Sequence, residues 1–245
     1  MAPTAVRRRA ARPQVPNLYW DQVAELVTLD DAVRAIARAY NFRRHPYFLW
    51  AHDPNTSRVS FRCSQVRFRF AVEGWSQALS AVLARVPWLE HRRGLARNIA
   101  DEHGENLERS HKASFHRYLT ALGATAAELR TPCPVAVRAF QQATTNFCLV
   151  MPYEAGAAAL GVIEHLYIDI SADIGKLLHD RAWAEPGSQD HYAVHEELDV
   201  EHARDLLELA AQGWGDQRGR REVALGLLLG AHHFWQLYLD LLPTG

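Results

Sequence analysis

The feature that most constrains the fold of this chain is the helical spacing of its apolar residues. This spacing continues through almost every segment after Leu18. No convincing alternation of apolar and polar residues, typical of a β-strand, is present. With 245 residues the chain is long enough for one large domain and short for two. We therefore predict a single all-α domain over residues 18–245, built as a bundle of about seven helices.

Proline, glycine and capping residues divide this pattern into segments. The predicted helices are two short pieces at 30–40 and 45–52 and longer ones near 58–86, 87–123, 134–151, 153–180, 189–213 and 217–241, with a loop at 184–189. The spacing over 61–75 is partly two-residue, but the run is long and flanked by helices, so we predict a helix there too. Residues 1–17, which include Pro13 and Pro16, are predicted to form a disordered tail.

Composition excludes several classes of protein. The net charge is −1, which argues against a nucleic-acid-binding surface as the main function. The three cysteines are odd in number and lack CxxC spacing, as expected in a reducing compartment without a disulfide framework. No apolar run is long enough to cross a membrane, and the arginine-containing N-terminus has no apolar signal region. We therefore expect a cytoplasmic protein with no membrane partner.

The most informative motif is His195-x3-Asp199-x2-His202. At about 3.6 residues per helical turn, these three side chains share one face, within about 60° of each other. Two imidazoles and a carboxylate on one stripe suit a metal site. The alternative is a solvated charged face that happens to carry two histidines, so further ligands elsewhere in the chain decide between the two.

Glu164 supplies a second signal because it lies within the apolar run 155–168. Burying an unpartnered carboxylate costs several kcal/mol or forces its pKa upward. Either a metal ion or a buried salt bridge to an arginine would remove that cost. His165 is the next residue, about 100° round the helix, and is therefore predicted not to be a ligand.

The third segment, residues 97–123, contains several acids and histidines. His111 begins an amphipathic pattern and should face inward, and Glu102 follows apolar residues that place it inward as well. Nine residues separate the two, which would put them on opposite faces of a straight helix. An interruption at 103–106, HGEN, would bring them together. Glu108, three residues before His111, needs no such break and competes with Glu102.

In order and spacing, these pieces resemble the haem-oxygenase-like di-iron oxidases and oxygenases over about residues 45–240. Those proteins are seven-helix bundles whose third, fifth and sixth core helices supply three carboxylates and three histidines to two irons. The run RNIxxE at 97–102, and a glycine twelve residues after His111, also resemble family members and favour Glu102 over Glu108. The resemblance implies the metal ligands Glu102, His111, Glu164, His195, Asp199 and His202, with no catalytic residue beyond them.

Mixed carboxylate and imidazole ligation suits Fe(II) or Mn(II) and lacks the thiolates typical of structural zinc. The resemblance implies two Fe(II) per chain, with O2 as co-substrate and a peroxo-di-iron(III) intermediate. The expected substrate is a small, amino-acid-derived metabolite of a specialised biosynthetic route. N-oxygenation and oxidative C–C cleavage both stay open. The resemblance also implies a homodimer, and an external electron donor is an option.

Other interpretations compete with this one. Arg58, Arg62 and Arg69 could clamp a substrate carboxylate, or could lie on a solvated face. The same bundle could bind haem, or act as a thiaminase-like enzyme with Cys148 as the nucleophile. A non-enzymatic helical binding protein is the third possibility, in which the apolar residues of 225–242 could form a dimer surface.

Overall fold

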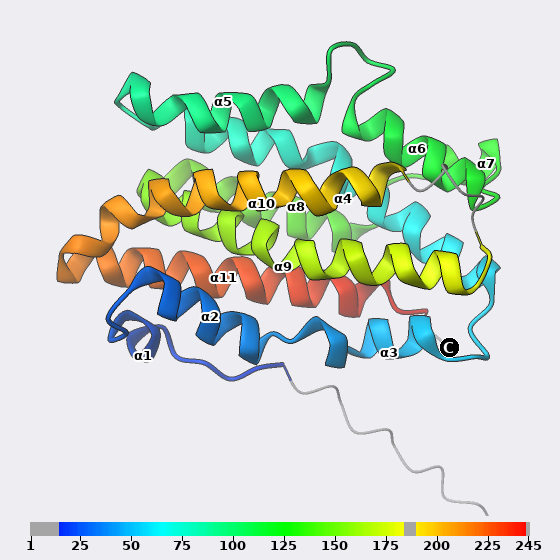
Figure 1. The fold of residues 1–245 in the computed structure, drawn as a ribbon, viewed down its shortest axis with the longest axis horizontal. Coiled ribbons are helices and arrows are strands. Elements are labelled where there is room, and N and C mark those ends of the chain that lie inside the picture. Colours follow the sequence, from blue (N-terminus) through cyan, green and yellow to red (C-terminus); the bar gives the residue numbers. More distant parts are fainter. Residues whose placement is uncertain (1–14, 184–189, 244–245) are drawn as a thin grey trace, which may run out of the picture.

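The computed structural model describes residues 15–183 and 190–243, without the side chains of 190 and 193–197. The described residues form α-helices and two short 3-10 helices, with no strand among them, which confirms the all-α prediction. Figure 1 shows the long helices side by side, with the short N-terminal helices along one edge. No described helix is long and apolar enough to cross a membrane.

The described elements are α1 (Trp20–Ala24), α2 (Leu29–Ala39), η1 (Phe42–Arg44), α3 (Pro46–His52), α4 (Arg58–Leu83), α5 (Leu89–His103), α6 (His111–Ala121), α7 (Ala126–Leu129), α8 (Val135–Val150), α9 (Tyr153–Asp180), α10 (Asp190–Ala211), η2 (Gln212–Gly215) and α11 (Gln217–Leu241).

The ranges predicted for α9 and α11 are confirmed. The expected count of about seven is wrong, because α1 and α7 were not predicted and the predicted helix 87–123 is divided into α5 and α6. The predicted loop 184–189 and the tail to residue 14 lie outside the described residues, and Val15 already packs against the core.

Local capping explains where the helices around the site begin. Ser57 precedes α4 and accepts a hydrogen bond from the backbone N–H of Ser60. Ser110 does the same for α6 with Ala113. Pro134 and Pro152 directly precede α8 and α9, as the missing proline N–H allows at the start of a helix.

Helix α9 is the centre of the bundle, and every residue from Ala155 to Glu164 is buried. It packs against α10, α11, α4 and α8. The approach of α11 is close, because a Cβ atom on Gly226 or Gly230 would collide with the backbone oxygens of Ala155 or Ala159. The surroundings of Glu164 are therefore a tightly packed interior.

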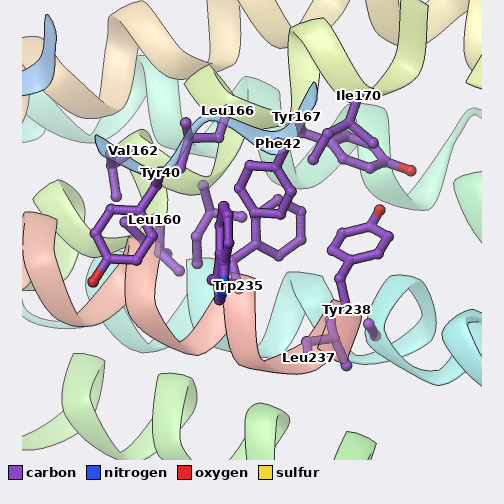
Figure 2. Packing of buried hydrophobic residues seen from close by; sticks show 14 of the residues in the cluster. Tyr40, Phe42, Leu160, Val162, Leu166, Tyr167, Ile170, Trp235, Leu237 and Tyr238 are labelled. Atoms are coloured by element: carbon purple, nitrogen blue, oxygen red, sulfur yellow. The ribbon is translucent and has the colours of Figure 1, made fainter. Parts of the chain in front are cut away.

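Aromatic side chains from α11 fill the core below α9. Trp235 and Tyr238 contact Phe42 of η1, with ring centroids 5.3 and 5.6 Å away, and Tyr167 of α9 lies in the same group (Figure 2). Val223, Leu227, Phe234 and Leu241 are also buried within the same chain. The apolar residues of 225–242 thus mainly build the protein's own core, and the idea that they form a dimer surface is wrong for these buried positions.

Candidate metal centre

Three of the sequence-predicted residues meet between α9 and α10. Glu164, Asp199 and His202 each offer one potential ligand atom, and these atoms all lie within 4.8 Å of one another. All three side chains are buried, with exposed fractions of 5%, 0% and 4%. The structure therefore joins the two segments that the sequence analysis placed on separate helices.

Glu102 and His111 form a second pair. Oε1 of Glu102 lies 2.8 Å from Nδ1 of His111, and both side chains are buried. The expected interruption at 103–106 is confirmed, since α5 ends at His103 and Gly104 has a positive φ of 65°. Glu108 is exposed, so the structure places Glu102 rather than Glu108 beside His111.

The two groups lie close enough to influence each other electrostatically. Burial, together with the charges of Asp199 and Glu102, raises the pKa of Glu164 to about 8, against the opposing effects of His202 and Trp75. Burial also raises the pKa of Asp199 to about 8, against the opposing effects of His202 and His111. For His111, burial lowers the pKa, but the hydrogen bond to Glu102 and the nearby carboxylates outweigh it and raise the pKa.

His195, the sixth expected ligand, lies in α10 four residues before Asp199. Its backbone belongs to this helix, and its side chain falls outside the described residues. Its role as a ligand therefore remains an expectation based on helical spacing.

The described residues fit a divalent cation. Carboxylates held at raised pKa values in a buried cluster need either protons or a cation. Nδ1 of His202 is buried and has no hydrogen-bond partner among the described residues, so this nitrogen is available to bind a cation. Oxygen and imidazole donors without a described thiolate suit iron or manganese.

Two further residues hydrogen-bond to the candidate ligands from outside the cluster and were not predicted to do so. Nε1 of Trp75 on α4 donates a hydrogen bond of 2.7 Å to Oε1 of Glu164. Oδ2 of Asp101 lies 3.0 Å from Nε2 of His202. No local pattern in the sequence shows that α4 and α9 meet at this point.

A fourth histidine, His191, was also missed. It is buried, its Nδ1 lies 2.9 Å from Oγ of Ser114, and its ring lies 6.1 Å from that of His111. The sequence does contain a signal for it, because His191 lies one helical turn before His195 at the start of α10.

A cavity of about 50 Å³ adjoins the centre. Its walls are mostly aromatic and aliphatic, and Glu102, His111 and Glu164 supply the polar side chains that line it. The apolar lining residues are Phe68, Ala71, Val72, Trp75, Phe140, Ile163, Tyr167 and Phe234. Trp75 and Tyr167 are among these lining residues, whereas Gln65 hydrogen-bonds to Tyr47 and Tyr192.

The proposed arginine clamp is wrong. Arg58 donates to the backbone oxygens of Ala121 and Leu122 at the end of α6. Arg62 forms an ion pair with Glu128 at 2.9 Å. These bonds tie α4 to α6 and α7, so neither side chain is directed at the cavity.

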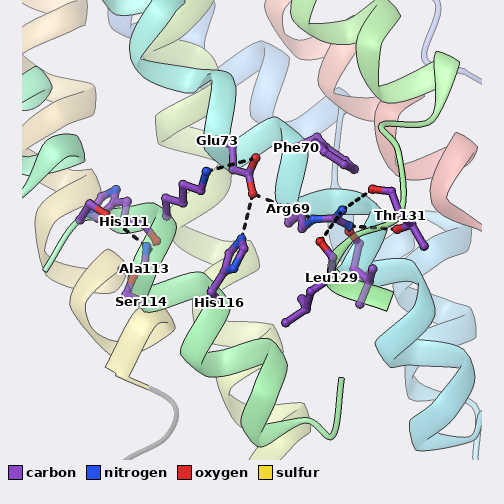
Figure 3. Close-up of polar contacts among 12 residues, drawn as sticks. Arg69, Phe70, Glu73, His111, Ala113, Ser114, His116, Leu129 and Thr131 are labelled. Carbon is purple, nitrogen blue, oxygen red and sulfur yellow. Dashed lines mark hydrogen bonds and ion pairs between the residues drawn. The ribbon is translucent and has the colours of Figure 1, made fainter. Parts of the chain in front are cut away.

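Arg69 is the third member of that set and is buried. Its guanidinium donates to the backbone oxygens of Leu129 and Thr131, as Figure 3 shows. Beside it on α4, Glu73 accepts a hydrogen bond from His116 of α6 at 2.9 Å. Arg69 therefore anchors the segment before α8 and does not bind a ligand at the centre.

Cys148 cannot serve as the nucleophile of a thiaminase-like reaction. It is fully buried, and burial raises the pKa of its thiol to about 12. It is also absent from the residues described as lining the cavity. A reactive cysteine needs access and a lowered pKa, so this alternative is wrong.

Comparisons with known proteins concern the family and the fold of this chain. A family model described as an iron-containing redox enzyme matches residues 65–235. The 4-aminobenzoate synthase of Chlamydia muridarum is 26% identical over 204 residues, which cover 80% of this chain and 86% of the relative. The 4-aminobenzoate synthase of Chlamydia trachomatis is 31% identical over 192 residues, which cover 76% and 82%.

Among solved structures, a domain of unknown function from Shewanella denitrificans with a heme oxygenase-like fold is similar to this chain. The TM-score is 0.70 at 11% sequence identity, and the match covers 88% of this chain and 92% of that chain. At this identity the similarity concerns the fold alone.

Proposed function

Because this chain belongs to the family of iron-containing redox enzymes and has a haem-oxygenase-like fold, we propose that it is a non-haem di-iron oxygenase or oxidase. It would use O2 to oxidise a small metabolite. The observation that carries the proposal is the meeting of Glu164, Asp199 and His202, with the pair Glu102 and His111 beside the same cavity. With His195, these residues complete the expected ligand set.

The charge of the site is compatible with two cations. Three carboxylates offset most of the charge of two ferrous ions and leave one net positive charge. When bound, the iron would supply electrons for the reduction of O2 and the oxidising power acting on the substrate. The protein would hold the ligands and keep bulk water away.

In the metal-free protein, two carboxyl groups of the site are protonated. With pKa values of about 8, the carboxyl groups of Glu164 and Asp199 carry protons at neutral pH. A cation would displace these protons, so binding of metal and release of protons are coupled.

The cavity supports a small or narrow substrate. A water molecule needs roughly 10–15 Å³ of such space, so a cavity of about 50 Å³ accommodates only a few small molecules or one end of a substrate. Its described lining contains no lysine or arginine, and residues 184–197 contain neither in their sequence. This favours a neutral or amine-bearing end at the centre over a carboxylate held by a basic side chain.

The substrate is proposed to be derived from an amino acid. Two relatives are named 4-aminobenzoate synthase, and their product is an aromatic amine. Formation of 4-aminobenzoate is therefore the first reaction to assay, and N-oxygenation and oxidative C–C cleavage of other amines are the next.

Metal content tests the proposal directly. The purified protein is loaded with Fe(II) without oxygen, desalted, and its iron measured by mass spectrometry. We expect close to two irons per chain, and a marked loss in Asp199→Ala. His116→Ala is the matched control, because this partly exposed histidine pairs with Glu73. A wild-type protein that retains no iron would refute the proposal.

A further inference from the structure

Beyond the ligand set, Trp75 and Asp101 are each bonded to one member of it. We propose that Trp75 and Asp101 are positioning residues, which decide which atoms of Glu164 and His202 face the metal. This inference rests on the proposed function, since it concerns the same centre. Both residues come from helices other than that of the residue they hold.

Trp75 acts on Glu164 from α4, a helix that contributes no expected ligand. An indole N–H only donates, and at 2.7 Å it engages Oε1 of Glu164. No other described side chain forms a hydrogen bond with this carboxylate. The bond therefore fixes the rotation of the carboxylate and leaves Oε2 as the less engaged oxygen. Trp75 also lines the cavity, so the same side chain orients a ligand and forms a wall.

Asp101 acts on His202 from the outer side. Its side chain is 42% exposed, whereas that of His202 is 4% exposed. An ionised carboxylate only accepts hydrogen bonds, so Nε2 of His202 carries the hydrogen and donates to Oδ2 of Asp101. In the neutral ring, Nδ1 then carries the lone pair, and this is the buried atom without a partner among the described residues. His202 is thereby set to bind metal through Nδ1.

The helical geometry explains why Asp101 can do this beside Glu102. Consecutive helical residues point about 100° apart, so Glu102 faces the interior while Asp101 reaches sideways to α10. Arg97 and Asp205 form a second link along the same α5–α10 contact, at 2.8 Å. Asp205 does not contact a proposed ligand through that bond, which makes it a matched control.

Substitutions that remove these two hydrogen bonds test the inference. Trp75→Phe retains a ring and removes the indole N–H, and Asp101→Leu removes the acceptor. Asp101→Asn retains a carbonyl acceptor and should preserve part of the effect. The controls are Trp88→Phe, at an exposed tryptophan, and Asp205→Asn. Binding of Co(II) to the purified full-length chain is titrated, and the visible ligand-field spectrum is recorded.

Loss of a partner that orients a metal ligand typically weakens metal binding by about 10- to 100-fold. We expect a loss in that range for Asp101→Leu and Trp75→Phe, with altered Co(II) spectra, and a smaller loss for Asp101→Asn. The controls should match the wild type. A variant with a lower thermal midpoint but an unchanged spectrum would indicate a purely structural role and overturn the inference. If Asp101→Leu fails to fold, the Co(II) affinity and spectrum of Asp101→Asn test the inference in its place.

The two proposals fail in different ways. If the wild type binds two metals per chain, and Asp101→Leu and Trp75→Phe have its affinity and spectrum, only the positioning inference is refuted. If the wild type binds no metal, the proposed function is refuted and the inference with it.

Discussion

Oε1 of Glu102 lies 2.8 Å from Nδ1 of His111, although nine residues separate them along the chain. A continuous helix would hold them on opposite faces. The contact exists because α5 stops at His103 and the chain reverses through Gly104 before α6 begins. One glycine thus controls whether two proposed ligands share a cavity.

Gly104→Ala should disrupt this junction. Gly104 has a φ of 65°, and an added Cβ would lie 2.5 Å from the backbone oxygen of Arg109. We expect a loss of roughly 1–2 kcal/mol in unfolding free energy from the backbone conformation alone, and a lower iron content. Gly175→Ala is the control, because a Cβ added there would lie 4.0 Å from the Cβ of Tyr192 and would not collide with it. Urea unfolding and iron analysis measure both, and equal behaviour of the two variants would contradict the prediction.

Glu102→Ala should reduce iron content, and Glu108→Ala should not. Glu102 is buried against His111, whereas Glu108 is exposed. Removing a proposed ligand should lower the iron retained after desalting by about one ion per chain, or abolish retention if the two sites are interdependent. Iron analysis of both variants beside the wild type checks this. An equal loss in both, or a loss only in Glu108→Ala, would reverse the assignment.

Stability of the metal-free protein should fall as pH rises from about 5 to about 8. The pKa values of Glu164 and Asp199 are raised to about 8 in the folded state, from ordinary values of 4.5 and 3.8. Within this window the folded state binds more protons than the unfolded state, so each rise in pH favours unfolding. Thermal unfolding in the presence of a chelator measures the trend.

Glu164→Gln should reduce that dependence on pH, because an amide does not ionise. At pH 8 the metal-free variant should be more stable than the wild type, by on the order of 1 kcal/mol or more. It should nevertheless bind iron less well, since it lacks a charged ligand. The exposed Glu201→Gln serves as the control, with wild-type pH dependence. A parallel pH profile for Glu164→Gln and the wild type would show that this carboxyl group is not buried in its neutral form.

Cys148 should be inert to alkylation in the native protein. Its thiol is buried, with its pKa raised to about 12, whereas Cys63 is exposed. Iodoacetamide at pH 8, followed by peptide mass spectrometry, should modify Cys63 within minutes and Cys148 only after unfolding. Rapid native labelling of Cys148, with loss of activity, would revive a cysteine-dependent reaction.

Several features followed from the sequence alone because they depend on local patterns. Helical spacing and proline boundaries predicted α9 and α11 at their observed ends, since both signals act within a few residues. The isolated acid Glu164 in an apolar run marked the site, because burial of such a group demands a partner. Spacing also placed Asp199 and His202 on one face of α10, and the structure finds both buried.

Other features depended on tertiary structure, because they join segments with no shared local pattern. Only packing brings Trp75 of α4 to Glu164 of α9, and Asp101 of α5 to His202 of α10. Arg58 and Arg62 have a spacing that would suit a clamp, yet their partners lie on α6 and α7. Helical period determines the direction of a side chain on its own helix. What that side chain meets is decided by the neighbouring helices, whose approach depends on burial summed over the whole core.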